Sequence, residues 1–170
     1  METRSTLSLK QEQQEKSLFL FVVVIGYLVT FLAASRDDVQ FSMSRLFVGI
    51  AFGVAYLILG VFDTEILRRF SANTRNALFF PIQIALVFGI GWTLGPGGHW
   101  LIGLPLAGMA VDRLSPRWRW LVYAALIATV VLPIGLRYST WEVAFTNGFI
   151  ISTAIFFVAA FSQFRLNEQK

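Results

Sequence analysis

The sequence predicts an all-α, polytopic membrane protein in which six transmembrane helices form a bundle with short loops. Hydrophobic residues make up 56% of the 170-residue chain and charged residues only 14%, against about 25% charged residues in soluble domains. The charges lie in short clusters between long uncharged stretches. A soluble domain of this size has too little interior to hide so many apolar side chains, so lipid must cover the rest.

Six stretches have the composition of membrane-spanning helices, which need roughly 20 apolar residues. They are expected at Ser17–Ser35, Leu46–Phe62, Asn76–Leu94, Gly98–Val111, Trp120–Leu136 and Val143–Phe164. Barrel strands would alternate polar and apolar residues, and "SLFLFVVVIGYLVTFLAA" does not alternate. The chain is thereby divided into a lead-in at 1–16, a transmembrane domain at 17–164 and the start of a signalling helix at 165–170.

The first two spans each have a charged or polar extension. "LSLKQEQQEK" precedes the first span, whose apolar run is longer than that of a signal peptide, so we expect an uncleaved anchor. The second span carries a Gly49-x-x-x-Gly53 step that lets another helix approach closely. The loop "DTEILRRFSANTRN" is expected to continue this span as a helix, with Glu65 and Arg69 as i, i+4 neighbours.

The third and fourth spans are joined by "GPGG", a turn signal that predicts a tight hairpin. The fourth span is short, rich in glycine and contains Pro105, so a re-entrant loop is its alternative. Its Gly103 and Ala107 repeat the small-residue spacing of the second span. For both small-residue steps a dimer seam and packing within the bundle remain open interpretations.

The last span emerges from the bilayer without a helix breaker. Pro and Gly are both absent from Phe149 to Lys170, and the closing residues are acceptable to good helix formers. We therefore expect one continuous helix that extends past the headgroups.

The positive-inside rule sets the orientation. With six spans and both termini in the cytoplasm, eleven of the fourteen Lys and Arg residues lie inside and three outside. The three outside are Arg36, Arg45 and Arg137. If the fourth segment did not cross, seven would lie on each side and the bias would vanish. The rule therefore favours six full spans with both termini in the cytoplasm.

Polar side chains at depth are few. No Asp, Glu, Lys or Arg lies deep in any span, and Gln83 and Asn147 are the strongest polar residues there. They predict either a polar pocket between the third and sixth spans or ordinary interhelical hydrogen bonds, and the second is commoner. His99 is the only histidine and is expected at the membrane interface, in the "GPGGHW" turn.

The chain lacks the residue patterns of catalytic and metal sites. It has no cysteine, one histidine and no clustered acid, base and nucleophile. We therefore predict that it is not an enzyme and that it holds no catalytic residue, cofactor or metal. The net charge of +4 is explained by topology, so no nucleic-acid partner is expected.

The segments "DRLSPRWRWLVYAALIATVVLPIGLRY" and "FFVAAFSQFRLNEQK" resemble the membrane-spanning sensor region of bacterial sensor histidine kinases of the DesK and NarX type. The resemblance covers about the last seventy residues at best. It implies a membrane sensor of a two-component system, whose last helix passes a bilayer or small-molecule signal to a cytoplasmic kinase domain or partner protein, and a homodimer. Arg165, Glu168 and Lys170 would then carry the output.

The departure from that family is the kinase core. Its phospho-acceptor histidine and ATP-binding boxes would follow the signalling helix, and this sequence contains neither. The chain is thus expected to be a sensor region without its kinase core or a separate membrane protein. The runner-up is a substrate-binding membrane subunit of an energy-coupling-factor type vitamin transporter. A non-catalytic membrane protein of another role is a further alternative.

Overall fold

The computed structural model describes residues 2–34, 42–95 and 98–168. In these ranges the chain is all α-helical, with seven helices. They are α1 (Glu2–Ala34), α2 (Met43–Val61), α3 (Asp63–Ile66), α4 (Ala72–Leu94), α5 (His99–Arg113), α6 (Pro116–Tyr138) and α7 (Trp141–Glu168). The fold class predicted from composition is therefore confirmed as all-α, and each of the six expected spans coincides with a helix.

Within the described ranges, four helices are long and apolar enough to cross a membrane. They span Met43–Val61, Ala72–Leu94, Pro116–Arg137 and Trp141–Arg165. The apolar part of α1, Lys16–Leu32, is shorter. Four such helices in one chain are those of a multi-pass membrane protein. Large side chains on their outer faces fit this setting, since Phe149 is 75% exposed and Phe161 71%.

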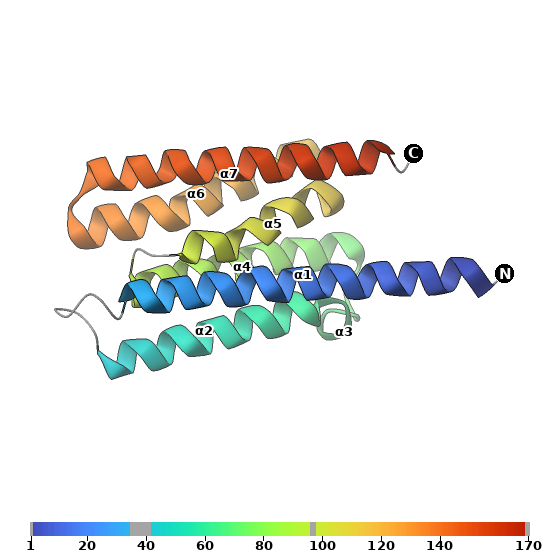
Figure 1. Ribbon diagram of the computed structural model, residues 1–170, viewed down its shortest axis with the longest axis horizontal. Helices are drawn as coiled ribbons and strands as arrows, with labels where there is room; N and C mark the ends of the chain where they lie inside the picture. The colour runs from blue at the N-terminus through green and yellow to red at the C-terminus, as the bar shows by residue number, and fades with distance from the viewer. Residues whose placement is uncertain (1, 35–41, 96–97, 169–170) are drawn as a thin grey trace.

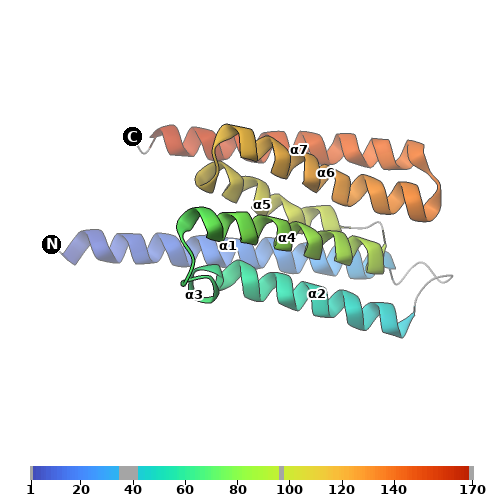
Figure 2. The ribbon, with the colours of Figure 1, turned by 180° about the vertical axis from the view of Figure 1, so that it is seen from behind.

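The six long helices run up and down in two layers. Helices α1, α5 and α7 form one layer (Figure 1) and α2, α4 and α6 the other (Figure 2). The first described turn of α1 and the last of α7 lie at the same end of the bundle (Figure 1). We call this the terminal end and the opposite one the distal end. Helix α3 and the C-terminal end of α5 also lie at the terminal end.

Helix α5 is the centre of the bundle and the segment for which a re-entrant loop was the alternative. It is one unbroken helix of 15 residues that packs against α1, α4, α6 and α7. At 1.5 Å per residue it is about 22 Å long, shorter than the roughly 30 Å of hydrocarbon in a bilayer. Ile102, Leu106, Ala107 and Ala110 on it are fully buried. Because neighbouring helices cover it, α5 does not need the length or apolar surface of a lipid-facing helix.

The ends of the helices follow local signals in the sequence. Ser71 precedes α4, and its hydroxyl accepts a hydrogen bond from the backbone N–H of Thr74 at 3.3 Å. Pro116 begins α6, where its missing N–H costs nothing. Helix α7 continues without a break to Glu168, as expected from the absence of Pro and Gly in its second half.

The loop after α2 differs from the expectation. The prediction that "DTEILRRFSANTRN" extends α2 is wrong, because α2 ends at Val61 and only the single turn of α3 follows. Glu65 therefore does not lie on a continuous helix with Arg69. Its side chain accepts a hydrogen bond from the Thr64 hydroxyl at 3.0 Å. Two hydrogen bonds lower the pKa of the Glu65 carboxyl. The larger effect comes from the bond with its own backbone N–H and the smaller from the bond with the Thr64 hydroxyl.

Candidate functional site

Two consecutive charged residues end α5 and connect it to different neighbours. Side chains one position apart on a helix point about 100° away from each other. Arg113 forms an ion pair with Asp63 of α3, and Asp112 lies 3.9 Å from the guanidinium of Arg165 on α7. The end of the central helix is thus joined to both halves of the chain.

The Asp63–Arg113 pair is the more buried of the two. Asp63 is only 4% exposed, and Arg113 Nη1 donates to its carboxylate. The guanidinium also lies over the ring of Phe79, 5.1 Å from its centroid. The Asn76 side chain of α4 donates to the Arg113 carbonyl at 3.1 Å. Removing one partner of such a pair leaves a partly buried charge without compensation.

A second set of contacts holds the end of α7. Arg119 on α6 donates to the Leu114 carbonyl at 2.8 Å and to the side-chain oxygen of Gln163 at 3.1 Å. Gln163 and Arg165 lie two residues apart on α7, so α5 and α6 both contact the last turns of this helix. We call Asp63, Asp112, Arg113, Arg119, Gln163 and Arg165 the terminal cluster.

Sequence reasoning did not assign a role to Asp63 or Asp112. Both were treated as loop residues, although each lies directly at the end of an apolar run. An acidic side chain next to lipid or a bundle interior requires a partner. That position was the available signal, but the partners Arg113 and Arg165 follow only from the packing of the helices.

The two polar residues predicted at depth do not share hydrogen bonds. Gln83 on α4 is fully buried and donates to the Tyr56 carbonyl of α2 at 3.2 Å. Asn147 donates to the Val143 carbonyl of its own helix at 2.8 Å. Gln83 thus makes an interhelical hydrogen bond, while Asn147 bonds within α7. Behind Gln83, the Tyr56 hydroxyl donates to the Ile102 carbonyl of α5 at 2.6 Å.

His99 is the first residue of α5, at the distal end of the bundle, and its side chain is buried. It is 1% exposed and lies against Gly91 of α4. Within the described residues neither ring nitrogen makes a hydrogen bond of normal geometry, but the imidazole faces the backbone carbonyl of Thr129. Pro133 has no N–H to donate to the carbonyl four residues earlier. The Thr129 carbonyl therefore lacks that backbone hydrogen bond within α6 and lies beside the buried imidazole.

The small residues considered for a dimer seam are buried inside one chain. A Cβ at Gly49 would lie 2.7 Å from Leu94 of α4, and one at Gly53 would lie 2.2 Å from Tyr27 of α1. Gly103 is buried and Ala107 is fully buried within α5. Of the two interpretations left open, these contacts fit packing within the bundle.

Two of the three predicted output residues, Arg165 and Glu168, lie at the end of α7. Arg165 contacts Asp112 across to α5. Glu168 is the last residue of the helix, and Lys170 lies outside the described residues. No group of three or more His, Asp or Glu side chains that could hold a metal occurs within the described part of the chain.

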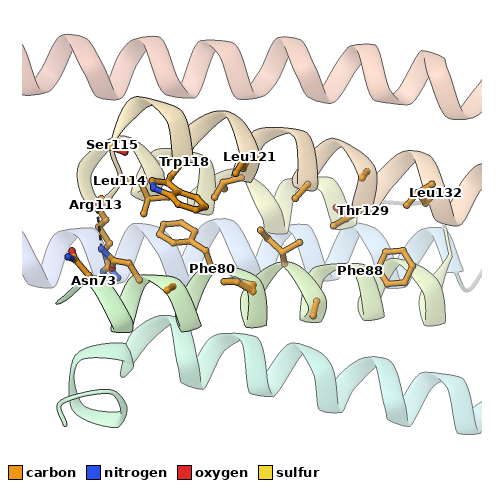
Figure 3. A pocket seen from close by; sticks show the side chains of 18 residues that line it. Asn73, Phe80, Phe88, Arg113, Leu114, Ser115, Trp118, Leu121, Thr129 and Leu132 are labelled. Atoms are coloured by element: carbon orange, nitrogen blue, oxygen red, sulfur yellow. Dashed lines mark hydrogen bonds between the residues drawn. The ribbon is translucent and has the colours of Figure 1, made fainter. Parts of the chain in front are cut away.

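A groove of about 1010 Å³ runs along the outside of the bundle between α4 and α6 (Figure 3). Small residues make room for it: Ala77, Pro81 and Ala85 lie four apart on α4, and Ala125 and Ala128 face them from α6. Larger apolar side chains form its walls. The groove is therefore a product of residue size on two neighbouring helices.

The two ends of the groove differ in polarity. Asn73, Arg113 and Ser115 lie at the terminal end, beside the indole of Trp118 (Figure 3). Phe88 and Leu132 line the other end, next to Thr129, whose hydroxyl donates to the Leu126 carbonyl of its own helix at 2.7 Å (Figure 3). The arrangement suits a long amphiphile better than a compact polar molecule.

Comparison with models of protein families, with curated proteins and with solved structures finds no match to this chain. Function has therefore to be argued from the residues and their arrangement.

Proposed function

We propose that this chain is a six-span sensor and signal-relay protein of a bacterial cytoplasmic membrane, with both termini in the cytoplasm. The up-and-down order of the helices supports an even number of crossings, and so does the position of the first described turn of α1 and the last turn of α7 at one end of the bundle (Figure 1). In this proposal α1 and α5 cross along with the four helices that are long and apolar enough to span a membrane. The basic loops then lie with the termini, as the positive-inside rule requires.

The observation that carries the relay is the terminal cluster. Asp112 and Arg113 are neighbours on the central helix, yet one contacts α7 and the other α3. A tilt or shift of α5 relative to α4 therefore changes the contacts of Arg165 as well as those of Asp63. Helix α7 is continuous to Glu168, so motion at Arg165 reaches its end.

The signal that fits this arrangement is a property of the bilayer. Exposed Phe, Leu and Ile cover the outer helices, and a mismatch between helix length and bilayer thickness costs fractions of a kcal/mol per Å. Such costs shift a two-state equilibrium that is already near balance. The receiver would be a cytoplasmic kinase domain or partner protein, in a homodimer as the resemblance implies.

Topology is tested by single-cysteine labelling, which is clean because the chain has no cysteine of its own. Thr64→Cys and Asn167→Cys lie at the terminal end, and Ser42→Cys and Thr140→Cys lie at the distal end. A membrane-impermeant maleimide added to intact cells should label only the distal pair. Labelling of either terminal-end cysteine would overturn the six-span arrangement.

The relay is tested by joining residues 1–170 to a histidine kinase core and measuring autophosphorylation in bilayers of increasing acyl-chain length. We expect activity to change with thickness and Asp112→Asn to flatten that response. The matched control is Glu142→Gln, which makes the same change at an exposed position of α7 at the distal end. A flat response in the unmodified fusion, or an unchanged response in Asp112→Asn, contradicts the relay.

A further inference from the structure

We propose that the groove between α4 and α6 binds one anionic phospholipid, with an acyl chain along the groove and the phosphate at its terminal end. The inference requires only that the chain lies in a bilayer, and it does not depend on the relay. The bound lipid belongs to the leaflet at the terminal end of the bundle.

The length of the groove matches one acyl chain. From Asn73 to Phe88 the α4 wall covers about 22 Å at 1.5 Å per residue. One leaflet contributes about 15 Å to the hydrocarbon thickness of a bilayer. The rest of the length of the groove would lie at the level of the glycerol and headgroup region. The interior is apolar for most of this length, with Ile84, Leu121 and Val122 among its walls.

The polar end lies where a headgroup would lie. Trp118 is 62% exposed, and tryptophan side chains favour the level of the membrane–water interface. Beside it, Asn73 and Ser115 are exposed hydrogen-bonding side chains. An acyl chain that entered from the distal end would instead place its headgroup against Phe88 and Leu132.

Charge selects an anionic headgroup. The side chain of Arg113 is 30% exposed, and its guanidinium has five N–H donors, so the contact of Nη1 with Asp63 does not exhaust it. The segments 63–75 and 112–119, which flank the polar end, together contain six Arg residues and three Asp or Glu residues. Each basic residue near the surface strengthens binding of an anionic lipid, and one such contact corresponds to about a fivefold preference.

Acyl-chain contacts by themselves give little preference, because lipid tails are as apolar as the groove. Selectivity must therefore come from the headgroup, and occupancy from the fit of the chain between the small residues. These two contributions are separable by substitution. A charge at the polar end should change the preference for the headgroup, and a bulky side chain in the groove should remove binding of either lipid.

The experiment uses the delipidated full chain in detergent, titrated with palmitoyl-oleoyl phosphatidylglycerol or phosphatidylcholine and measured by native mass spectrometry. We expect one phosphatidylglycerol to be retained about fivefold more tightly than phosphatidylcholine. Asn73→Asp should abolish that preference and Asn73→Lys should keep it. Asn167→Asp is the control, since it adds the same charge on α7 at the terminal end, away from the groove.

Groove filling is tested with Ala85→Phe on α4 and Ala125→Phe on α6, which should each lower lipid retention about tenfold because the ring occupies the space of the chain. Ala160→Phe adds the same ring to an exposed position of α7 and should leave retention unchanged. Ala85 is exposed, so this variant should fold even if Ala125→Phe does not. Equal retention of the two lipids, or retention unaffected by Ala85→Phe, would overturn the proposal.

Discussion

The two ends of the bundle are held together by different kinds of contact. At the distal end α4 meets α5, and α6 meets α7, through glycine: a Cβ at Gly91 would lie 2.8 Å from His99, and one at Gly135 would lie 2.3 Å from Trp141. Arg137 adds one polar contact there, donating to the Trp92 carbonyl at 2.6 Å. At the terminal end the helices are joined by the charged and polar side chains of the terminal cluster. Close-packed contacts tolerate almost no displacement, whereas long charged side chains can follow a partner. The end of the bundle from which α7 emerges is therefore the adjustable one.

The largest effect should come from breaking the buried pair at the terminal end. Asp63→Ala leaves the Arg113 guanidinium partly buried without its carboxylate, and we expect the free energy of unfolding in detergent to fall by about 3 kcal/mol. Thr64→Ala changes the exposed neighbouring position and should cost less than about 0.5 kcal/mol. Equal stability of the two variants would show that the pair does not hold the terminal end.

A smaller loss is expected from overpacking the distal end. Gly98 has a φ of −75°, which alanine also adopts, so only space limits the substitution. A Cβ there would lie 2.7 Å from Val29 Cβ and 3.0 Å from the Gly26 carbonyl. Gly98→Ala should therefore lower the free energy of unfolding by about 1–3 kcal/mol.

Gly108→Ala is the matched control in the same helix. Its Cβ would lie 3.5 Å from Ser162 Oγ, which is ordinary contact, so stability should be unchanged or higher by up to about 1 kcal/mol. If Gly98→Ala and Gly108→Ala changed the free energy of unfolding equally, the two ends of the bundle would differ only in their charged contacts.

The smallest effect on stability should come from the exposed pair of the terminal cluster. Asp112 and Arg165 are each about two-fifths exposed, and their charged atoms lie 3.9 Å apart. Asp112→Asn should cost about 0.2–1 kcal/mol at low salt, and the difference should shrink at 1 M salt because the charges are screened. A loss above that of Asp63→Ala would mean that α7 is held rigidly rather than adjustably.

The helices could be predicted from the sequence because apolar runs and their breakers determine them locally. The expected span Asn76–Leu94 and the helix Ala72–Leu94 end at the same residue, where "GPGG" begins. The end of α2 at Val61 was not predicted, because the residues that follow it are compatible with a helix. The chain turns there so that the side chain of Asp63 is buried and accepts a hydrogen bond from Arg113. Propensity cannot report such a tertiary contact.

The site was predictable only in part. Gln83 was identified by its polarity at depth, and its partner is the backbone of Tyr56, which no side-chain pattern reveals. The groove depends on which faces of α4 and α6 meet, since Ala77 and Ala125 are unremarkable small residues until they lie opposite each other. Residue type therefore located candidates, and helix packing determined what they contact.

The short, enclosed α5 has a consequence for how the protein is made. It contains Pro105 and ends in Asp112 and Arg113, and it offers lipid little apolar surface of its own. Such a segment partitions weakly from the translocon into the bilayer when it stands alone. In the proposed six-span arrangement we therefore expect its insertion to be cooperative, with α4 retaining it during synthesis until α6 and α7 have followed and enclosed it.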